Sequence, residues 1–289
     1  SCSTINQTYT NFELIISDDC STDATSRICS EYAKQQDNSE FRINTFSNSG
    51  KLIRNGLNIF VDGENCSTYL NGLFVTCESG EVVVAGSDGH RMSLGRSRHL
   101  KSFVESASFF MSRKLVLELM KLLKGLDVHA PVHCFVGARF FRIASDGFEV
   151  LSTLETLADL SYLQLIPTHF MGEVAVDKAT LKTALSHCMV LSDGRFARAD
   201  VEISATRLQV VAYNFDQEHI KSSLQVEGEC QPIKVSLNVA YLHEVAQTIA
   251  GDQLNMQIVK ENQSIFIKEE TDQMEAFYLI MPLLTHHTS

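Results

Sequence analysis

A chain of 289 residues with 44% hydrophobic content is long enough to bury two or three cores of ordinary size, which predicts a multidomain protein. No apolar run reaches the roughly 18 residues that a membrane span requires, and eight scattered cysteines form no CxxC pair, so we expect a cytoplasmic protein with reduced thiols, no metal site and no membrane partner. The net charge of −11 counts against a nucleic-acid partner only if the charge is evenly spread along the chain.

The first predicted elements lie in residues 3–25, which read STINQTYTNFELIISDDCSTDAT. An apolar strand ends at Asp18 and Asp19, and a helix follows that Ser21 or Thr22 would cap. An acidic pair ends many strands, so these two carboxylates alone indicate no function.

From residue 47 onward, one unit of a helix and short antiparallel strands recurs four times. Four segments have helical apolar spacing and begin roughly 60 residues apart, and each begins near a polar residue suited to capping. These segments are residues 49–60, 111–125, 177–194 and 237–252. Because β-rich runs follow each one, we predict an α+β fold of two tandem domains, each with two helices on an antiparallel sheet, preceded by a short α/β fragment.

Turn and linker residues subdivide this pattern. Two Ser-Asp-Gly triplets, at 87–89 and 145–147, lie between β-rich runs, where Asp-Gly supplies the positive φ of a hairpin turn. Pro167 lies where a linker between two domains is expected. We therefore predict the short α/β fragment at residues 1–40 and the two tandem domains at residues 41–168 and 169–289.

The second predicted helix is strongly basic in an acidic chain. Its charged residues are Arg113, Lys114, Glu118, Lys121 and Lys124. Its three lysines share a face opposite the Leu and Met stripe. The third helix adds Lys178 and Lys182, and the fourth contains neither lysine nor arginine. One interpretation is a solvated helix face, and the other is a positive surface that follows DNA phosphates without reading bases.

Five short stretches carry a resemblance to a known family. They are YLNGLFVT from Tyr69, GSDGHRMSL from Gly86, MSRKLVLELMKLL from Met111, LNVAYLHEVA from Leu237 and AFYLIMPLL from Ala276. In content and order they resemble the second and third domains of the bacterial sliding clamp, the β subunit of the replicative DNA polymerase, over residues 51–284. The resemblance implies tandem clamp domains, a non-catalytic processivity factor without a cofactor, and a ring whose helices face duplex DNA.

The family also has a pocket between its second and third domains, where polymerase and clamp-loader subunits dock through a short peptide motif. The resemblance implies a pocket formed by Leu70, Ser87, Gly89, His90, Arg91, Met92, Leu165, Phe196, Tyr241, Met281, Pro282 and Leu283. It implies sequence-independent contacts with duplex DNA for Tyr69, Arg113, Lys114, Lys121, Lys124, Lys178 and Lys182. On spacing alone, His90 and Arg91 merely flank a hairpin turn, which is the alternative interpretation.

Residues 3–50 resemble the start of a family 2 glycosyltransferase with the GT-A fold. This resemblance makes Asp18 and Asp19 the remnant of a nucleotide-sugar site. The Asp-x-Asp motif that would hold a metal ion and the diphosphate is not found downstream, so we expect a fragment unable to transfer a sugar alone. The alternatives to a clamp are therefore a nucleotide-sugar-binding protein and a non-catalytic interaction scaffold.

The expected oligomeric state follows from the missing first clamp domain. Rings of this family close when the first domain of one subunit meets the third domain of its neighbour. We therefore expect a monomer or an irregular oligomer, and a trimer of two-domain chains is the alternative.

Overall fold

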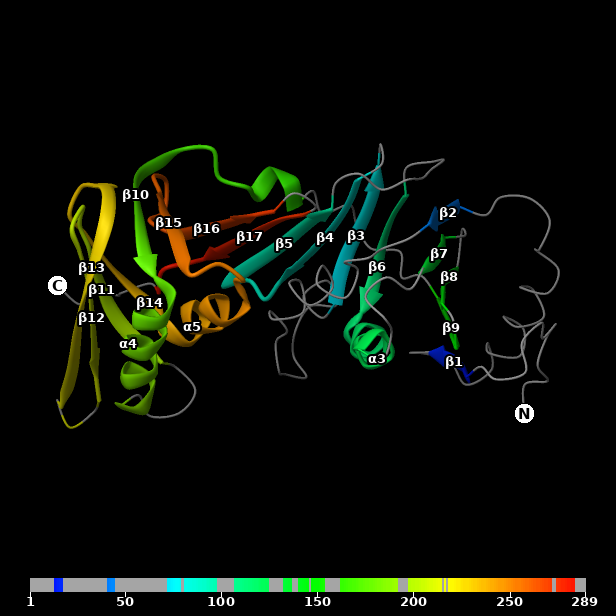
Figure 1. The fold of residues 1–289 in the computed structure, drawn as a ribbon, viewed down its shortest axis with the longest axis horizontal. Helices are drawn as coiled ribbons and strands as arrows, with labels where there is room; N and C mark the ends of the chain where they lie inside the picture. The colour runs from blue at the N-terminus through cyan, green and yellow to red at the C-terminus, as the bar shows by residue number, and fades with distance from the viewer. Residues whose placement is uncertain are drawn as a thin grey trace. The chain divides into compact units, whose positions relative to one another are not determined.

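The computed structural model describes most of the second half of the chain and separate segments of the first half (Figure 1). The described residues are 13–17, 41–44, 72–78, 81–97, 107–124, 132–136, 140–145, 147–153, 162–191, 197–214, 216, 218–271 and 274–283. The helix predicted at 49–60 lies outside these ranges, as do Asp18, Asp19, Tyr69, Leu70 and Phe196. The chain divides into two compact units, the first being Ser1–Val84 with Arg96–Ala158 and the second Ala85–Gly95 with Asp159–Ser289.

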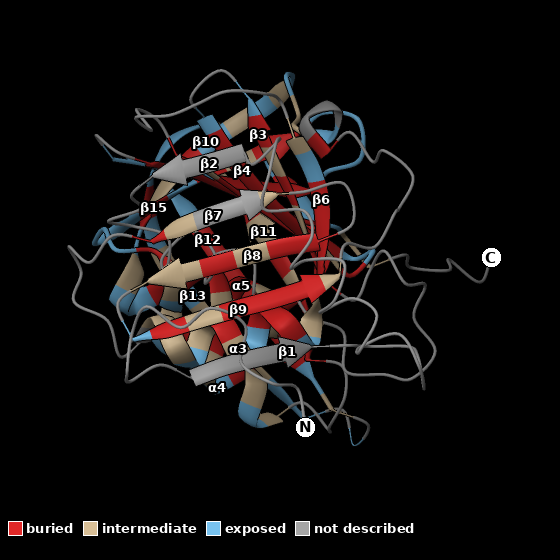
Figure 2. Cartoon of the chain, turned by 90° about the vertical axis from the view of Figure 1, so that its right-hand side faces the viewer, coloured by how far each residue is buried: buried red, intermediate tan, exposed pale blue. Residues whose placement is uncertain are grey.

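One sheet of the first unit combines strands from distant parts of the chain. Its order is β1 (Glu13–Ser17), β9 (Phe148–Thr153), β8 (Phe140–Ser145), β7 (His133–Val136) and β2 (Phe41–Asn44). β1 runs parallel to β9, and the other neighbours are antiparallel. Figure 2 shows β9 mostly buried and β8 partly buried. The strand predicted before Asp18 is confirmed as β1, and it shares this sheet with strands of the following predicted domain.

The first unit also contains a helix packed on a strand pair. β3 (Gly72–Glu78) pairs antiparallel with β6 (Ala107–Ser112), and α3 (Arg113–Lys124) contacts both strands. Leu115 and Leu119 of α3 are fully buried, as expected for residues four apart on the apolar face of a helix. Burial of each such side chain contributes about 1.5 to 3 kcal/mol, and the polar face of α3 is left for solvent or a partner.

In the second unit, each strand pairs antiparallel with its neighbours in the sheet. In sheet order they are β14 (Ile233–Asn238), β11 (Arg198–Ile203), β12 (Arg207–Tyr213), β13 (His219–Cys230), β10 (Phe170–Asp177), β15 (Gln253–Val259), β16 (Ile265–Glu270) and β17 (Met274–Ile280). All of these neighbours are antiparallel. β13 pairs with β12 along its first half and with β10 along its second half. A Cβ atom at Gly228 would lie 2.1 Å from the carbonyl oxygen of Glu173, so glycine permits the close approach of β13 to β10.

Two helices of the second unit pack against each other and against its strands. α4 (Lys178–Leu191) contacts β10, β12 and β13, and α5 (Val239–Thr248) contacts α4 and β17. Leu181 and Leu185 of α4 and Leu242 of α5 have no exposed surface. The prediction of helices packed on antiparallel strands, and with it the α+β fold class, is confirmed. None of the described helices is long and apolar enough to cross a membrane.

The helices begin slightly later than predicted, because each follows a strand without an intervening loop. Ser112, Asp177 and Asn238 are the last residues of β6, β10 and β14, and they directly precede α3, α4 and α5. Their side-chain oxygens accept hydrogen bonds from backbone N–H groups two or three residues later, at 3.5, 2.8 and 3.1 Å. The polar residue that caps each helix is therefore also a strand residue.

A hairpin turn connects β4 (Glu81–Ser87) to β5 (Arg91–Ser97), two strands with residues in both units. Gly89 has φ of 83° in this turn, and Gly147 has φ of 96° between β8 and β9. The prediction of positive φ at both Asp-Gly turns is confirmed.

Candidate functional site

The turn from Ser87 to Arg91 is held by its own side chains. One carboxylate oxygen of Asp88 accepts the backbone N–H groups of His90 and Arg91, both at 2.9 Å. The hydroxyl of Ser87 donates to the carbonyl of Arg91 at 2.9 Å and accepts the N–H of Gly89 at 3.1 Å. His90 is therefore fixed through its backbone, whereas its side chain is exposed.

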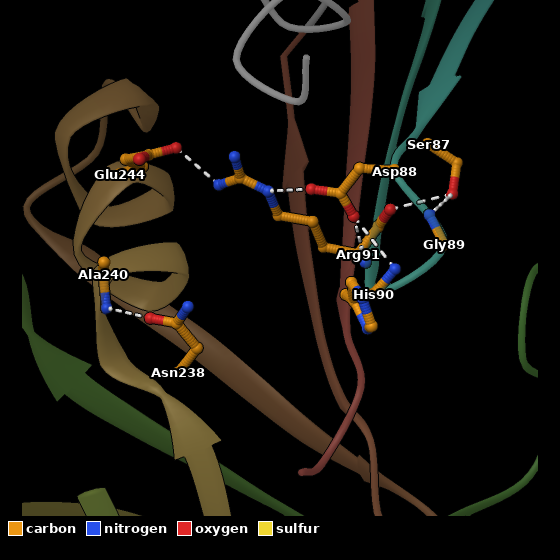
Figure 3. A network of polar contacts seen from close by, with 8 residues as sticks. All are labelled: Ser87, Asp88, Gly89, His90, Arg91, Asn238, Ala240 and Glu244. Atoms are coloured by element: carbon orange, nitrogen blue, oxygen red, sulfur yellow. Dashed lines mark hydrogen bonds and ion pairs between the residues drawn. The ribbon is translucent and has the colours of Figure 1, made fainter. Parts of the chain in front are cut away.

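Arg91 joins this turn to helix α5 (Figure 3). Its Nε atom donates to the second carboxylate oxygen of Asp88 at 3.0 Å, and a terminal nitrogen donates to Glu244 at 2.5 Å. Its guanidinium carbon lies 4.1 Å from the ring centroid of Tyr241, which is a cation–π contact. We call these four residues the Arg91 cluster. Only 9% of the Arg91 side chain is exposed, so its charge is paired almost entirely within the protein.

Tyr241 contributes an apolar ring to the cluster and stays neutral at physiological pH. Burial raises the pKa of its hydroxyl, the charge of Asp88 raises this pKa further, and Arg91 opposes the change. Tyr241 occupies the first turn of α5, whose start is fixed by the Asn238 cap. The same helix start therefore orients the aromatic ring against Arg91.

The segment after β17 lies beside this turn. The backbone N–H of Met281 donates to the carbonyl of His90 at 2.9 Å, and that of Leu283 donates to Ser236 of β14 at 2.8 Å. Met281 is 41% exposed, while Pro282 and Leu283 are half-buried. The segment thus presents apolar side chains next to His90, from a backbone anchored at both ends.

The structure brings together most of the described residues that were predicted for the peptide pocket. We call residues 87–91, Tyr241 and residues 281–283 the docking surface. Met92 is only 4% exposed within β5, so its side chain offers almost no surface to a ligand. Leu165 ends the 3₁₀ helix η2 (Tyr162–Leu165) and is 55% exposed. Leu70 and Phe196 lie outside the described residues.

Sequence reasoning missed two members of the Arg91 cluster. Asp88 was considered only as a turn residue, and Glu244 was not considered at all. A signal for Glu244 existed, because it follows Tyr241 by three residues and therefore shares its helix face. Nothing in the local sequence indicates that this face meets Arg91.

The basic helix α3 presents two well exposed lysines. Lys114 is exposed, and the side chain of Lys121 is 71% exposed. Glu118 accepts a hydrogen bond from Lys121 at 2.8 Å, which partly offsets its charge. Arg113 is half-buried, and the side chain of Lys124 is outside the described residues. Among the described side chains of α3, Lys114 and Lys121 are thus the exposed cations.

The predicted DNA-contacting lysines of α4 differ from each other. The ammonium of Lys178 lies 3.3 Å from the carbonyl oxygens of Ile249 and Ala250, where it stabilises the C-terminal end of α5. Lys182 is half-buried. Lys178 consequently has a structural role in addition to any contact with a partner.

A histidine bridges α4 and α5 next to Lys182. The hydroxyl of Ser186 and Nε2 of His243 are 3.1 Å apart. Burial lowers the pKa of His243, the positive charge of Lys182 lowers it further, and Glu244 opposes them. The imidazole is therefore neutral at pH 7. Within the described part of the chain, no group of three or more His, Cys, Asp or Glu residues is arranged to hold a metal ion.

Most of the chain matches two domains of a known protein family. Residues 49–156 match the central domain of the DNA polymerase III beta subunit, and residues 163–284 match its C-terminal domain. Residues 2–56 match glycosyl transferase family 2, over a short N-terminal stretch.

Individual relatives and solved structures agree with this assignment. The beta sliding clamp of Vibrio cholerae is 27% identical over 215 residues, covering 74% of this chain and 58% of the relative. The beta sliding clamp of Escherichia coli K12 is 26% identical with the same coverage, so the chain spans 58% of the length of these relatives. A DNA polymerase III subunit beta from Pseudomonas aeruginosa superposes with a TM-score of 0.77 at 23% identity, covering 84% of this chain and 66% of that one.

A DNA polymerase III beta subunit from Thermotoga maritima superposes with a TM-score of 0.77 at 18% identity, covering 86% of this chain and 66% of that one. These likenesses support the fold, and the relatives and both domain matches support the family. Over residues 49–156 and 163–284, the chain belongs to the DNA polymerase III beta subunit family.

Proposed function

We propose that this chain acts as a DNA sliding clamp, a non-catalytic processivity factor in the cytoplasm. It contacts or encircles duplex DNA without reading its sequence, and it docks polymerase and clamp-loader subunits through a short peptide motif. The curated relatives named above are beta sliding clamps, and a solved sliding clamp from Pseudomonas aeruginosa is bound to griselimycin.

The docking surface carries the peptide part of this proposal. Three segments far apart in the sequence meet there, namely the turn at 87–91, helix α5 and residues 281–283. Together they combine the exposed apolar side chain of Met281 and the half-buried ring of Tyr241 with the exposed polar imidazole of His90. Such a mixture suits a short peptide with hydrophobic anchors, because apolar contacts supply affinity and a few polar groups fix orientation.

The exposed lysines of α3 support the DNA part of the proposal. A clamp must hold phosphates loosely enough to slide, and exposed, salt-screened charges meet that requirement better than contacts to bases. We propose Lys114 and Lys121 as phosphate contacts, with Arg113, Lys178 and Lys182 contributing from half-buried positions. Lys124 and Tyr69, whose side chains lie outside the described part of the chain, complete the proposed set.

Calorimetry with a synthetic peptide tests the proposed function directly. The probe Gln-Ser-Ser-Leu-Phe should bind the full chain with a Kd of about 1 μM, equivalent to roughly −8 kcal/mol. The scrambled peptide Ser-Phe-Gln-Leu-Ser has the same composition and should not bind. Equal binding of both peptides, or binding of neither to the folded chain, would exclude specific peptide docking.

A further inference from the structure

We propose that Asp88 and Glu244 are positioning residues of the docking surface. They hold the guanidinium of Arg91 as an internal bridge between the 87–91 turn and α5, so Arg91 supports the surface and does not serve as a cation for the partner peptide. This inference rests on the proposed peptide docking, but one of its tests does not need the peptide.

The guanidinium of Arg91 makes its contacts within the Arg91 cluster. Its Nε atom donates a hydrogen bond to Asp88, and a terminal nitrogen donates one to Glu244. The ring of Tyr241 covers the face of the guanidinium, with its centroid 4.1 Å from the guanidinium carbon. With 9% of its side chain exposed, Arg91 leaves little surface to a ligand. Two carboxylates face one guanidinium, so the cluster as a whole has no spare positive charge.

Hydrogen bonds connect the Arg91 bridge to His90 and Met281 of the docking surface. Asp88 holds the Arg91 side chain with one carboxylate oxygen and the backbone N–H groups of His90 and Arg91 with the other. The carbonyl of His90 in turn accepts the N–H of Met281 at 2.9 Å. A continuous chain of hydrogen bonds therefore runs from Glu244 through Arg91 and Asp88 to Met281.

Glu244 can be removed without disturbing the core of the second unit. The Glu244 side chain is 43% exposed, so its removal creates no core cavity. Loss of this carboxylate frees one end of the Arg91 bridge, while the buried face of α5 stays packed. The expected change is thus local to the turn and to the segment that contains Met281.

Hydrogen exchange measured on the full chain tests the bridge without a ligand. In Glu244→Ala, the amide of Met281 should exchange about tenfold faster, as expected when one charge-assisted hydrogen bond is lost. Glu244→Gln retains an acceptor and should give a smaller increase. Gln247→Ala is the matched control, because Gln247 is exposed on the same helix. An unchanged rate at Met281 would overturn the inference, as would faster exchange throughout the chain.

Measurements of peptide affinity distinguish two roles for Arg91, an internal bridge and a cation that contacts the partner peptide. If Arg91 is a bridge, Glu244→Ala should weaken binding of Gln-Ser-Ser-Leu-Phe about five- to tenfold. If Arg91 instead binds the peptide, the same variant frees its charge and should strengthen binding of the acidic peptide Gln-Ser-Asp-Leu-Phe, which would overturn the inference. Absence of binding by the unmodified chain would exclude the proposed peptide docking, and the exchange rate at Met281 would still decide whether Arg91 is a bridge.

Discussion

Replacement of Met281 by alanine measures how much the docking surface gains from its exposed apolar group. Complete burial of a methionine side chain contributes about 1.5 to 3 kcal/mol, so covering the exposed 41% contributes about 0.6 to 1.2 kcal/mol. Met281→Ala should therefore raise the peptide Kd by about three- to eightfold. The backbone N–H that donates to His90 is retained in the variant, so the segment itself should stay in place.

The assay is calorimetric titration of the full chain with Gln-Ser-Ser-Leu-Phe. Val190→Ala is the matched control, because Val190 of α4 is an apolar side chain with 85% exposure outside the docking surface. Its Kd should equal that of the unmodified chain. An unchanged Kd for Met281→Ala, or an equal loss in both variants, would refute the assignment of Met281 to the peptide contact.

Three further outcomes are expected. Replacing both Lys114 and Lys121 with alanine should reduce the slope of log affinity for duplex DNA against log salt by up to about 1.8, measured by fluorescence anisotropy, and an unchanged slope would exclude them as phosphate contacts. Tyr278→Phe should leave the free energy of unfolding in urea denaturation unchanged or raise it by up to about 1 to 3 kcal/mol, because the buried hydroxyl of Tyr278 has no hydrogen-bond partner among the described residues. A clear loss of stability would show that the hydroxyl has a partner. The pKa of His243 in the folded chain lies below its ordinary value of 6.5, so the unfolded chain binds this proton first as pH falls, and the free energy of unfolding should decrease as pH drops from 6.5 to the lower pKa. His243→Gln should lack this part of the pH dependence. A variant with the same pH profile as the unmodified chain would contradict the lowered pKa.

Helix positions could be predicted from sequence because burial follows the helical period. In α4, for example, Leu181 and Leu185 are four residues apart and both are fully buried. The helix starts were less predictable, because Asp177 and Asn238 are strand residues and helix caps at once. Local capping preferences do not distinguish a loop before a helix from a strand that continues directly into it.

The candidate site could be predicted only in part. The turn at 87–91 has a local signal in its Asp-Gly pair, but Arg91 and Glu244 are 153 positions apart, and their contact depends on the tertiary fold. The same limit applies to Lys178. Spacing assigns this lysine to an exposed face, whereas the fold places its ammonium at the C-terminal end of the neighbouring helix.

The distribution of charge explains how an acidic chain can fit the proposed function. In the second unit, three cations each lie between two carboxylates, so each group has a net charge of −1. They are Arg91 with Asp88 and Glu244, Lys234 with Asp200 and Glu202, and Lys268 with Glu270 and Glu275. Helix α3 has the opposite balance, with exposed Lys114 and Lys121 and a single carboxylate at Glu118. Phosphates are repelled by the former groups and attracted by the exposed lysines of α3, so the overall charge of −11 does not exclude binding of a duplex.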